Sequence, residues 1–366
     1  MENIKQKIRK AVKYLISTIH TTLLKHLNKI SNFFINKINY KVSNFNKYLI
    51  TLISLLFIYL FYLTVPNLYD KTWVQNTIET KLLNEFNINF SISSEISYEI
   101  LPSPHFIIKN AKILDDNSNN PKELSEIKKL SVFISQKNLF NKDKLKLKKI
   151  LIDKANFTVQ KSDFKFFKKI FNKEFSNKKI IIKDSSIFFR DLEKETIAIT
   201  KVQKLFLFHD NLKFLNILKS KAEIFNIPFS LKLEKEFFSL DNKTKITIDS
   251  DKLRFKFFNK IFKKLDNESN TINGLSTIST SDSQIITSYE YTDNLILLRS
   301  KKSTSKNYSA QYKGKINLDP FNLDLDIDLG ETKLKKLVNL DSIIWEIFKS
   351  KLLFNDNISA NISINI

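Results

Sequence analysis

The sequence predicts a mainly β protein with a few helices, preceded by one membrane-spanning helix near residues 48–65. The helix is predicted by an apolar run of 18 residues that contains no charge. The β class is predicted by strict alternation of apolar and polar residues in several later segments, which is typical of antiparallel sheet with one buried face. The chain has 366 residues, 42% of them hydrophobic, which is enough for one large or two ordinary domains with real cores.

The apolar run, Tyr48 to Val65, has the length of a membrane span. A helix of this length rises about 27 Å, close to the ~30 Å hydrocarbon core of a bilayer. Pro66 and Asn67 then end it. A buried helix of a soluble protein is disfavoured because every face is apolar. A cleaved signal peptide is disfavoured because the run starts late and no small-residue cleavage site follows.

The charge on the two sides of this run predicts its orientation. Residues 1–47 hold ten Lys or Arg and a single acid, Glu2, whereas residues 66–85 hold two lysines and three acids. The positive-inside rule places the N-terminus in the cytoplasm and the bulk of the chain in the periplasm of a bacterial inner membrane. Apolar residues recur every three or four positions in the 1–47 arm, which fits either a basic amphipathic helix on the anionic leaflet or a solvated charged arm.

The pattern after the membrane run divides the chain further. A short amphipathic helix is predicted at 71–86, a β domain over 66–265, a polar loop over 266–288, and further strands with one helix over 289–366. Helices are also expected at 164–175 and 333–353. The chain stops at Ile366 inside a strand pattern, which fits either an edge strand or a sequence cut from something longer. The strands expected from alternation are 88–92, 106–113, 130–135, 144–152, 180–182, 187–189, 229–234, 245–249, 321–329 and 358–366.

Two strands near the end carry the candidate binding residues. In 321–329 the leucines and isoleucines alternate with Asp324, Asp326 and Asp328, and we expect these aspartates to line a solvated face opposite lysines of a neighbouring strand. The apolar face of such a sheet needs a cover, either a second sheet in a closed sandwich or acyl chains in an open sheet. The candidate lipid-facing residues are Leu323, Leu325, Ile327, Ile362 and Ile364.

The composition argues against catalysis, metals and nucleic acids. The chain has no cysteine and three glycines, so thiol chemistry and a glycine-rich phosphate loop are excluded. The spacing of the three aspartates departs from a calcium loop, which needs Gly at its sixth position and Glu at its twelfth. No His pair or nucleophile elbow occurs. The net charge is +22, and all but four of the basic residues are lysine. Because nucleic-acid readers rely on arginine for bidentate contacts, this composition disfavours nucleic-acid binding. We expect no enzyme activity and no cofactor.

Several stretches of the sequence, and the order of these stretches, resemble the AsmA family of inner-membrane-anchored periplasmic proteins. This family is related to the TamB and YhdP group. After the apolar run and amphipathic helix come EISYEILPSPH at 95–105 and the strand FIIKNAKI at 106–113. LSEIKKLSVFIS at 124–135, LKLKKILIDKANF at 145–157 and IIIKDSSIFFRD at 180–191 follow. The resemblance covers roughly residues 48–260 and rests on order and spacing. The chain departs from it where Ser185 or Ser186 replaces the usual glycine, and it is shorter than typical members.

The resemblance implies an elongated, curved antiparallel sheet that forms an apolar groove. It also implies a non-catalytic role in phospholipid transfer between membranes or in outer-membrane assembly, with membrane phospholipids as partners. The alternative is a structural or assembly factor with a closed β domain that binds envelope proteins. Lipid identity and the direction of transport do not follow from the sequence.

Overall fold

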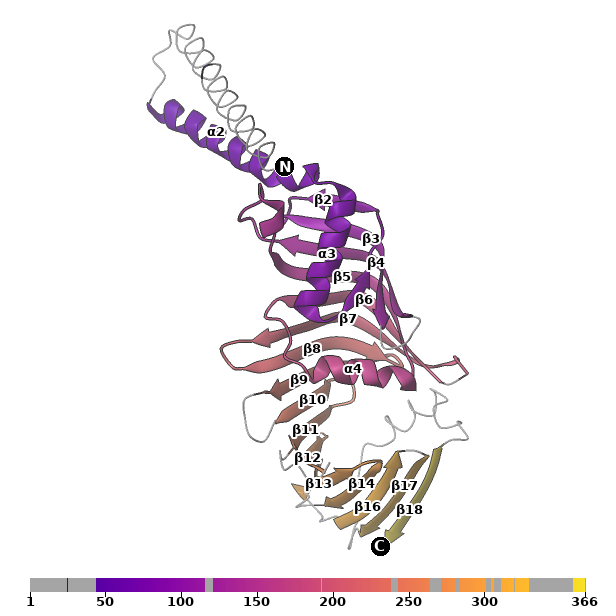
Figure 1. The fold of residues 1–366 in the computed structure, drawn as a ribbon. Coiled ribbons are helices and arrows are strands. Elements are labelled where there is room, and N and C mark those ends of the chain that lie inside the picture. Colours follow the sequence, from indigo (N-terminus) through magenta and orange to yellow (C-terminus); the bar gives the residue numbers. More distant parts are fainter. Residues whose placement is uncertain are drawn as a thin grey trace. The chain divides into compact units, whose positions relative to one another are not determined.

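The structure is a computed structural model in which helices near the start of the described chain are followed by a long series of strands (Figure 1). It describes Lys25 and residues 44–365, with gaps at 116–120, 192, 238–242, 264–270, 281–282, 301–303, 306–310, 319 and 329–357. The predicted amphipathic arm at 1–47, except for Lys25 and residues 44–47, and the predicted helix at 333–353 lie outside the described residues. The chain forms two compact units, residues 1–61 and residues 62–366.

The predicted membrane span is a continuous helix. Helix α2 spans Asn44–Thr64 and continues into the 3₁₀ turn η1, Val65–Leu68. The segment Phe45–Leu68 is long and apolar enough to cross a membrane, and every side chain from Phe45 to Phe61 is exposed. An apolar helix with exposed side chains all round is suited to a lipid surrounding. Pro66 falls in the 3₁₀ turn, as expected for a residue that cannot continue the α-helix.

Helix α3, Lys71–Phe86, confirms the predicted amphipathic helix at 71–86. Asp70 caps its N-terminus, where the carboxylate accepts a hydrogen bond of 2.8 Å from the backbone N–H of Trp73. Asn87 ends it in the left-handed conformation that asparagine tolerates. The stripe spaced by four residues, Val74, Ile78, Leu82 and Phe86, is buried.

Eighteen strands of the described residues form one sheet. β1 and β2 both pair with β3, and the later strands then pair in chain order out to β18. The two-residue strand β15 adds to β13. The sheet is open and curved, which confirms the predicted fold class. The strands are β1 Asn89–Ser91, β2 Ile96–Glu99, β3 His105–Asp115, β4 Lys122–Ile134, β5 Leu147–Val159, β6 Lys179–Arg190, β7 Thr196–Asp210, β8 Leu215–Ile224, β9 Ile227–Glu236, β10 Thr244–Ser250, β11 Phe255–Lys263, β12 Ile272–Ser279, β13 Ser283–Thr292, β14 Leu295–Ser300, β15 Thr304–Ser305, β16 Gln311–Leu318, β17 Phe321–Asp328 and β18 Ile358–Asn365.

The sheet is antiparallel except at two places. β5 and β6 pair in parallel, as do β17 and β18. A parallel pair needs a crossover, and the first one contains the 3₁₀ turn η3, Lys161–Asp163, and helix α4, Phe164–Phe171. Helix α4 confirms the predicted helix at 164–175, although it ends four residues earlier.

Two segments differ from the prediction. Residues 266–288 were predicted as a polar loop, but β12 and most of β13 lie there, and both are paired along their whole length with neighbours. Serine and threonine fit a half-buried pleated surface, so a polar composition did not indicate a loop. The segments 180–182 and 187–189, predicted to flank a turn, instead lie in one strand, β6, whose register with β5 and β7 is the same before and after Asp184. Asp184 has a φ of 45°, and the Ser185 hydroxyl accepts a 3.0 Å hydrogen bond from the backbone N–H of Ala155.

The hydrophobic core lies between helix α3 and the first part of the sheet. The buried stripe of α3 packs against one face of strands β1 to β6, and Phe166 of α4 joins the same cluster. Figure 1 shows α3 lying across these strands. The largest fully buried side chains include Ile78 and Leu82 from α3 and Ile108 and Leu130 from the sheet. One face of the early sheet is therefore closed by helices.

A partly buried ion pair holds the start of α4 on the sheet. The Lys122 ammonium in β4 lies 2.5 Å from a carboxylate oxygen of Asp163, whose side chain is 2% exposed. The other carboxylate oxygen of Asp163 accepts a 2.9 Å hydrogen bond from the backbone N–H of Gln160. A buried carboxylate needs such partners, so these contacts set where the crossover packs.

Candidate lipid-binding face

The register of the sheet places apolar side chains in rows that cross many strands on one face. One row begins in the core at Ile150 and Ile180 and continues through Leu207, Leu218, Leu233 and Ile246. Paired residues lie on the same side of a sheet, so this face is the one that α3 covers at the start. The same face continues to the far end as a surface that we call the apolar face; between β9 and β17 it comprises Leu231, Leu233, Ile246, Ile248, Phe257, Ile261, Ile272, Ile278, Ile285, Ile296, Leu298, Ile316, Leu323, Leu325 and Ile327.

Within the described residues, the helical cover of this face ends near β8 and β9. The last partly buried side chains packed on the core are Ile182 and Leu207, in β6 and β7. The apolar face residues of β9 to β17 are half-buried instead. Among the described residues, none from these strands belongs to the buried core cluster. An apolar surface that begins as a core and continues half-exposed is an unusual feature in a soluble protein and marks a binding surface.

A polar clamp holds the segment after α4 on the sheet where the cover ends. The buried Asn216 side chain accepts a 2.9 Å hydrogen bond from the backbone N–H of Phe175 and donates one of 2.8 Å to the carbonyl of Lys173. The buried His209 ring lies 3.0 Å from the same amide oxygen. The Lys235 ammonium donates to the carbonyl of Phe171 at 2.9 Å. These bonds hold the end of the crossover on strands β7 to β9.

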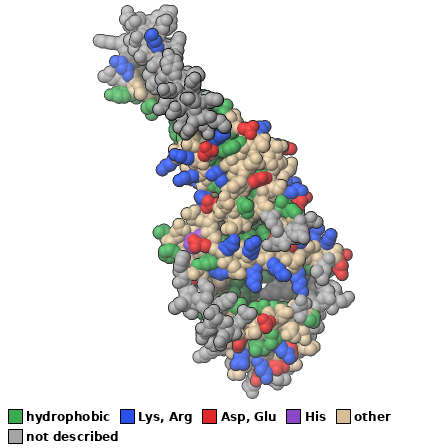
Figure 2. All heavy atoms as spheres, in the orientation of Figure 1, with side chains coloured by type: hydrophobic (Ala, Val, Ile, Leu, Met, Phe, Trp, Pro, Cys, Tyr) green, Lys and Arg blue, Asp and Glu red, His purple; other side chains and the backbone are tan. Residues whose placement is uncertain are grey.

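The opposite face of the same strands is mixed. It carries ion pairs in β9 and between β16 and β17, and apolar side chains in β11 to β14, among them Phe258, Ile286 and Leu297. Lys232 and Glu234 form an ion pair of 2.8 Å in β9. In β16 and β17, Lys315 lies 3.3 Å from Asp324 and Lys313 lies 3.7 Å from Asp326. This confirms that these aspartates face lysines of a neighbouring strand. Figure 2 shows blue and red side chains on the surface, with green hydrophobic side chains between them.

The five candidate lipid-facing residues come from two adjacent strands. Leu323, Leu325 and Ile327 of β17 are half-buried on the apolar face. The parallel register pairs Leu325 with Ile362 and Ile327 with Ile364, so the candidates occupy matching positions in β17 and β18.

Leu325 lies over a glycine of the neighbouring strand. A Cβ atom at Gly314 would stand 2.8 Å from the Leu325 Cδ1 atom and 2.6 Å from the Asp324 carbonyl oxygen. Atoms this close repel strongly, so the strand tolerates only glycine at this position without a shift.

A polar row that the sequence analysis missed crosses the middle of the apolar face. It consists of Asn259, Ser276, Thr287 and Ser300, which pair in register from β11 to β14. Each residue sits in an otherwise apolar alternation, so the only sequence signal was a polar residue at an inward position of each strand.

Two tyrosine hydroxyls satisfy part of this row. The Tyr289 hydroxyl donates a 3.0 Å hydrogen bond to the Asn259 amide oxygen, and the Tyr312 hydroxyl bonds that of Thr287. Burial raises the pKa of both tyrosines, so the hydroxyls stay neutral at physiological pH. The Tyr289 ring lies against Gly274, where a Cβ atom would be 2.0 Å from the ring. The row is therefore polar but carries no charge.

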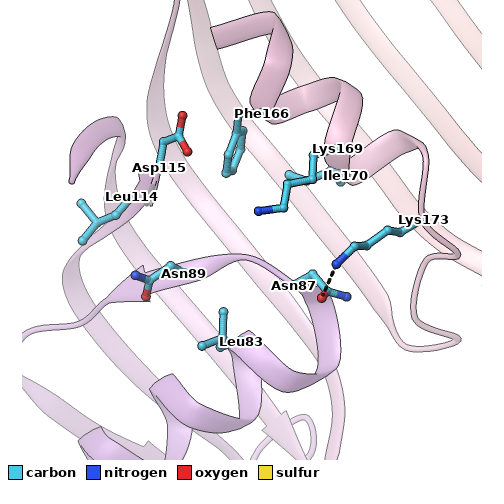
Figure 3. A pocket seen from close by; sticks show the side chains of 9 residues that line it. All are labelled: Leu83, Asn87, Asn89, Leu114, Asp115, Phe166, Lys169, Ile170 and Lys173. Carbon is cyan, nitrogen blue, oxygen red and sulfur yellow. Dashed lines mark hydrogen bonds between the residues drawn. The ribbon is translucent and has the colours of Figure 1, made fainter. Parts of the chain in front are cut away.

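A small cavity lies between the end of α3 and α4 (Figure 3). It has a volume of about 140 Å³, and Leu83, Phe166 and Ile170 line it together with polar side chains. Lys173 reaches across one side and donates a 3.1 Å hydrogen bond to the Asn87 side chain. Within the described part of the chain, no group of three His, Asp or Glu side chains could hold a metal ion. The apolar face is therefore the larger candidate binding surface.

The chain matches no model of a known protein family, and no curated protein matches it. Its function is inferred below from the arrangement of its own residues.

Proposed function

We propose that the chain is a non-catalytic, membrane-anchored β-groove protein that holds lipid acyl chains on its apolar face. In this role it takes part in phospholipid transfer or in outer-membrane assembly. The observation that carries the proposal is the apolar face itself, which runs through successive strands from a helix-covered core to the half-exposed strands β9 to β17. The anchor is helix α2, at the start of the same chain.

The physical reason for a lipid ligand is the length and shape of this surface. Burying apolar area contributes about 25 cal/mol per Å², or about 0.8 kcal/mol for each CH₂ group. Half-buried apolar side chains on successive strands offer this gain on both sides of the polar row, which suits a flexible hydrocarbon chain. The uncharged polar row beside it offers hydroxyl and amide groups for the ester or headgroup end of a lipid.

The resemblance to the AsmA family supports the same role, and we propose that the chain is an AsmA-like protein. The open sheet does not favour the alternative of a closed β domain that binds envelope proteins. A protein segment seated on the apolar face is the remaining alternative within this proposal. If a protein segment were the ligand, protein and not lipid would copurify with the chain.

The proposal is tested by mass spectrometry of molecules that copurify with the full-length chain in a mild detergent. We expect phospholipids to be retained after extensive washing, above the level bound to an unrelated single-span protein prepared in parallel. The proposal would be contradicted if detergent exchange removed all phospholipid without any loss of folded protein.

We also propose that the N-terminus lies in the cytoplasm and the sheet in the periplasm of a bacterial inner membrane. The ten basic residues and single acid of segment 1–47 support this orientation. A reporter that is active only in the periplasm should be active when fused after residue 90 and inactive when fused at residue 40. Activity of the residue-40 fusion alone would reverse the proposed orientation.

A further inference from the structure

Three large apolar side chains stand exposed at one end of the unit that holds the sheet. Leu68 ends the 3₁₀ turn η1 and is 82% exposed, Leu101 in the turn between β2 and β3 is 78% exposed, and Phe140 in the segment after β4 is 71% exposed. They come from three separate segments. Exposed apolar side chains that gather at one place mark an interaction surface.

Hydrogen bonds hold two of these segments against the last turn of helix α2. The Tyr62 hydroxyl donates to the carbonyl of Gln136 at 2.8 Å and accepts from the backbone N–H of Leu139 at 3.0 Å. The Phe140 ring lies 5.2 Å from the Tyr62 ring, centre to centre. The Tyr69 hydroxyl donates to the carbonyl of Leu139, which adds the residue after Leu68 to the same group.

The third segment is tied to the same turn. The Tyr98 hydroxyl in β2 donates to the carbonyl of Leu63 at 2.7 Å. The backbone N–H of Ile134 donates to the carbonyl of Pro104 at 3.0 Å, so the turn after β2 and the segment after β4 lie next to each other. Burial raises the pKa of Tyr98, which keeps its hydroxyl a donor.

These contacts place the segments that carry the three side chains next to Tyr62 and Leu63. Tyr62 and Leu63 belong to the last turn of helix α2, near the end of the apolar segment Phe45–Leu68. In the proposed membrane span, groups bonded to this turn stand near the level where the segment leaves the bilayer. The segment after β4 also exposes four lysines, Lys137, Lys142, Lys144 and Lys146, against one acid, Asp143. Basic side chains next to exposed apolar ones match the phosphates and the hydrocarbon boundary of a lipid surface.

We propose that Leu68, Leu101 and Phe140 form a membrane collar that dips into the bilayer surface around the end of α2. The nearby lysines contact lipid phosphates, and the tyrosine hydrogen bonds hold the collar on the helix. The start of the sheet is thereby seated on the lipid surface. This inference rests on the proposed membrane span but not on lipid binding by the apolar face.

The collar is tested with a fluorescent probe at single cysteines, because the natural chain has none. Variants Leu68→Cys, Leu101→Cys and Phe140→Cys of the full-length chain are labelled with a polarity-sensitive dye. They are placed in vesicles of phosphatidylcholine and phosphatidylglycerol that contain doxyl-labelled lipid. We expect blue-shifted emission and strong quenching at all three positions, since the dyes reach the quencher.

Two further positions serve as references in the same vesicles. Leu56→Cys lies within helix α2, and Leu212→Cys lies in the turn between β7 and β8, where the leucine is 93% exposed. Collar dyes quenched like Leu56 and unlike Leu212 support the inference. Collar dyes that behave like Leu212 while Leu56 is quenched overturn it and leave the proposed lipid-binding function standing. An unquenched Leu56 would overturn the membrane span and the collar together.

Discussion

Replacing Ile248 by glutamate is expected to leave the sheet folded and to remove most of the bound lipid. Ile248 lies on the apolar face in β10, half-buried, between Leu231 and Phe257 of the neighbouring strands. A carboxylate there can reach water when no lipid is bound, so the folded protein loses little stability. A bound acyl chain would have to desolvate the carboxylate, which costs several kcal/mol without a partner, and each 1.4 kcal/mol weakens binding tenfold.

The matched control for this change is Thr247→Glu. Thr247 is the preceding residue of the same strand, on the opposite face, where it pairs with Lys232. The control adds the same charge to the same strand but leaves the apolar face intact. Lipid that copurifies with each full-length variant is measured by mass spectrometry, and folding is followed by thermal unfolding. Equal lipid in both variants would show that Ile248 does not contact it, and an unfolded Ile248→Glu variant would show that the face is closed.

Replacing Leu130 by glutamate is expected to unfold the domain. Leu130 lies on the same face of the sheet as Ile248, but it is fully buried in the cluster beneath helix α3. An uncompensated charge in such a core costs several kcal/mol, a large share of the ~5–15 kcal/mol that stabilises a typical domain. Loss of the cooperative thermal transition in circular dichroism checks this result.

The control at the same position is Leu130→Met, which keeps the volume and costs less than about 1.5 kcal/mol. Its unfolding temperature should be only slightly below that of the natural protein. A folded Leu130→Glu variant would mean that α3 does not close the early sheet. The contrast between positions 130 and 248 then separates a covered from an uncovered part of one continuous face.

Elements with a strong local pattern could be predicted from the sequence. The run at 48–65 and the stripe of four apolar residues at 71–86 both form helices, because length and period were unambiguous. The strand at 321–328 follows its strict alternation, and two of its three aspartates, Asp324 and Asp326, pair with lysines as expected, whereas Asp328 lies opposite Gln311. In these segments the local physical chemistry and the final fold agree.

Other elements depended on pairing that local pattern does not reveal. β12 is rich in serine and threonine, and its strand state comes from full pairing with β11 and β13 on both sides. The parallel pairing of β5 with β6 is set by a crossover whose position depends on the contact between Lys122 and Asp163. Residues far apart in the chain decide such features, so a window of neighbouring residues cannot contain them.

Only part of the candidate site could be predicted from the sequence, for the same reason. Alternation identified Leu323, Leu325 and Ile327 as one face of one strand. The extent of the apolar face across β9 to β17 and the polar row through Asn259 and Thr287 follow from the register, which the sequence pattern alone did not fix.

We propose that lipid lies on the apolar face of the sheet and not on the opposite face. This proposal is tested most directly by photo-crosslinking in cells, with benzoylphenylalanine in place of single residues of the full-length chain. We expect lipid adducts, identified by mass spectrometry, at Ile248 and Leu325 and none at Thr247 and Asp326, their neighbours on the opposite face. Adducts of equal yield on both faces, or protein adducts alone at Ile248 and Leu325, would contradict the proposal.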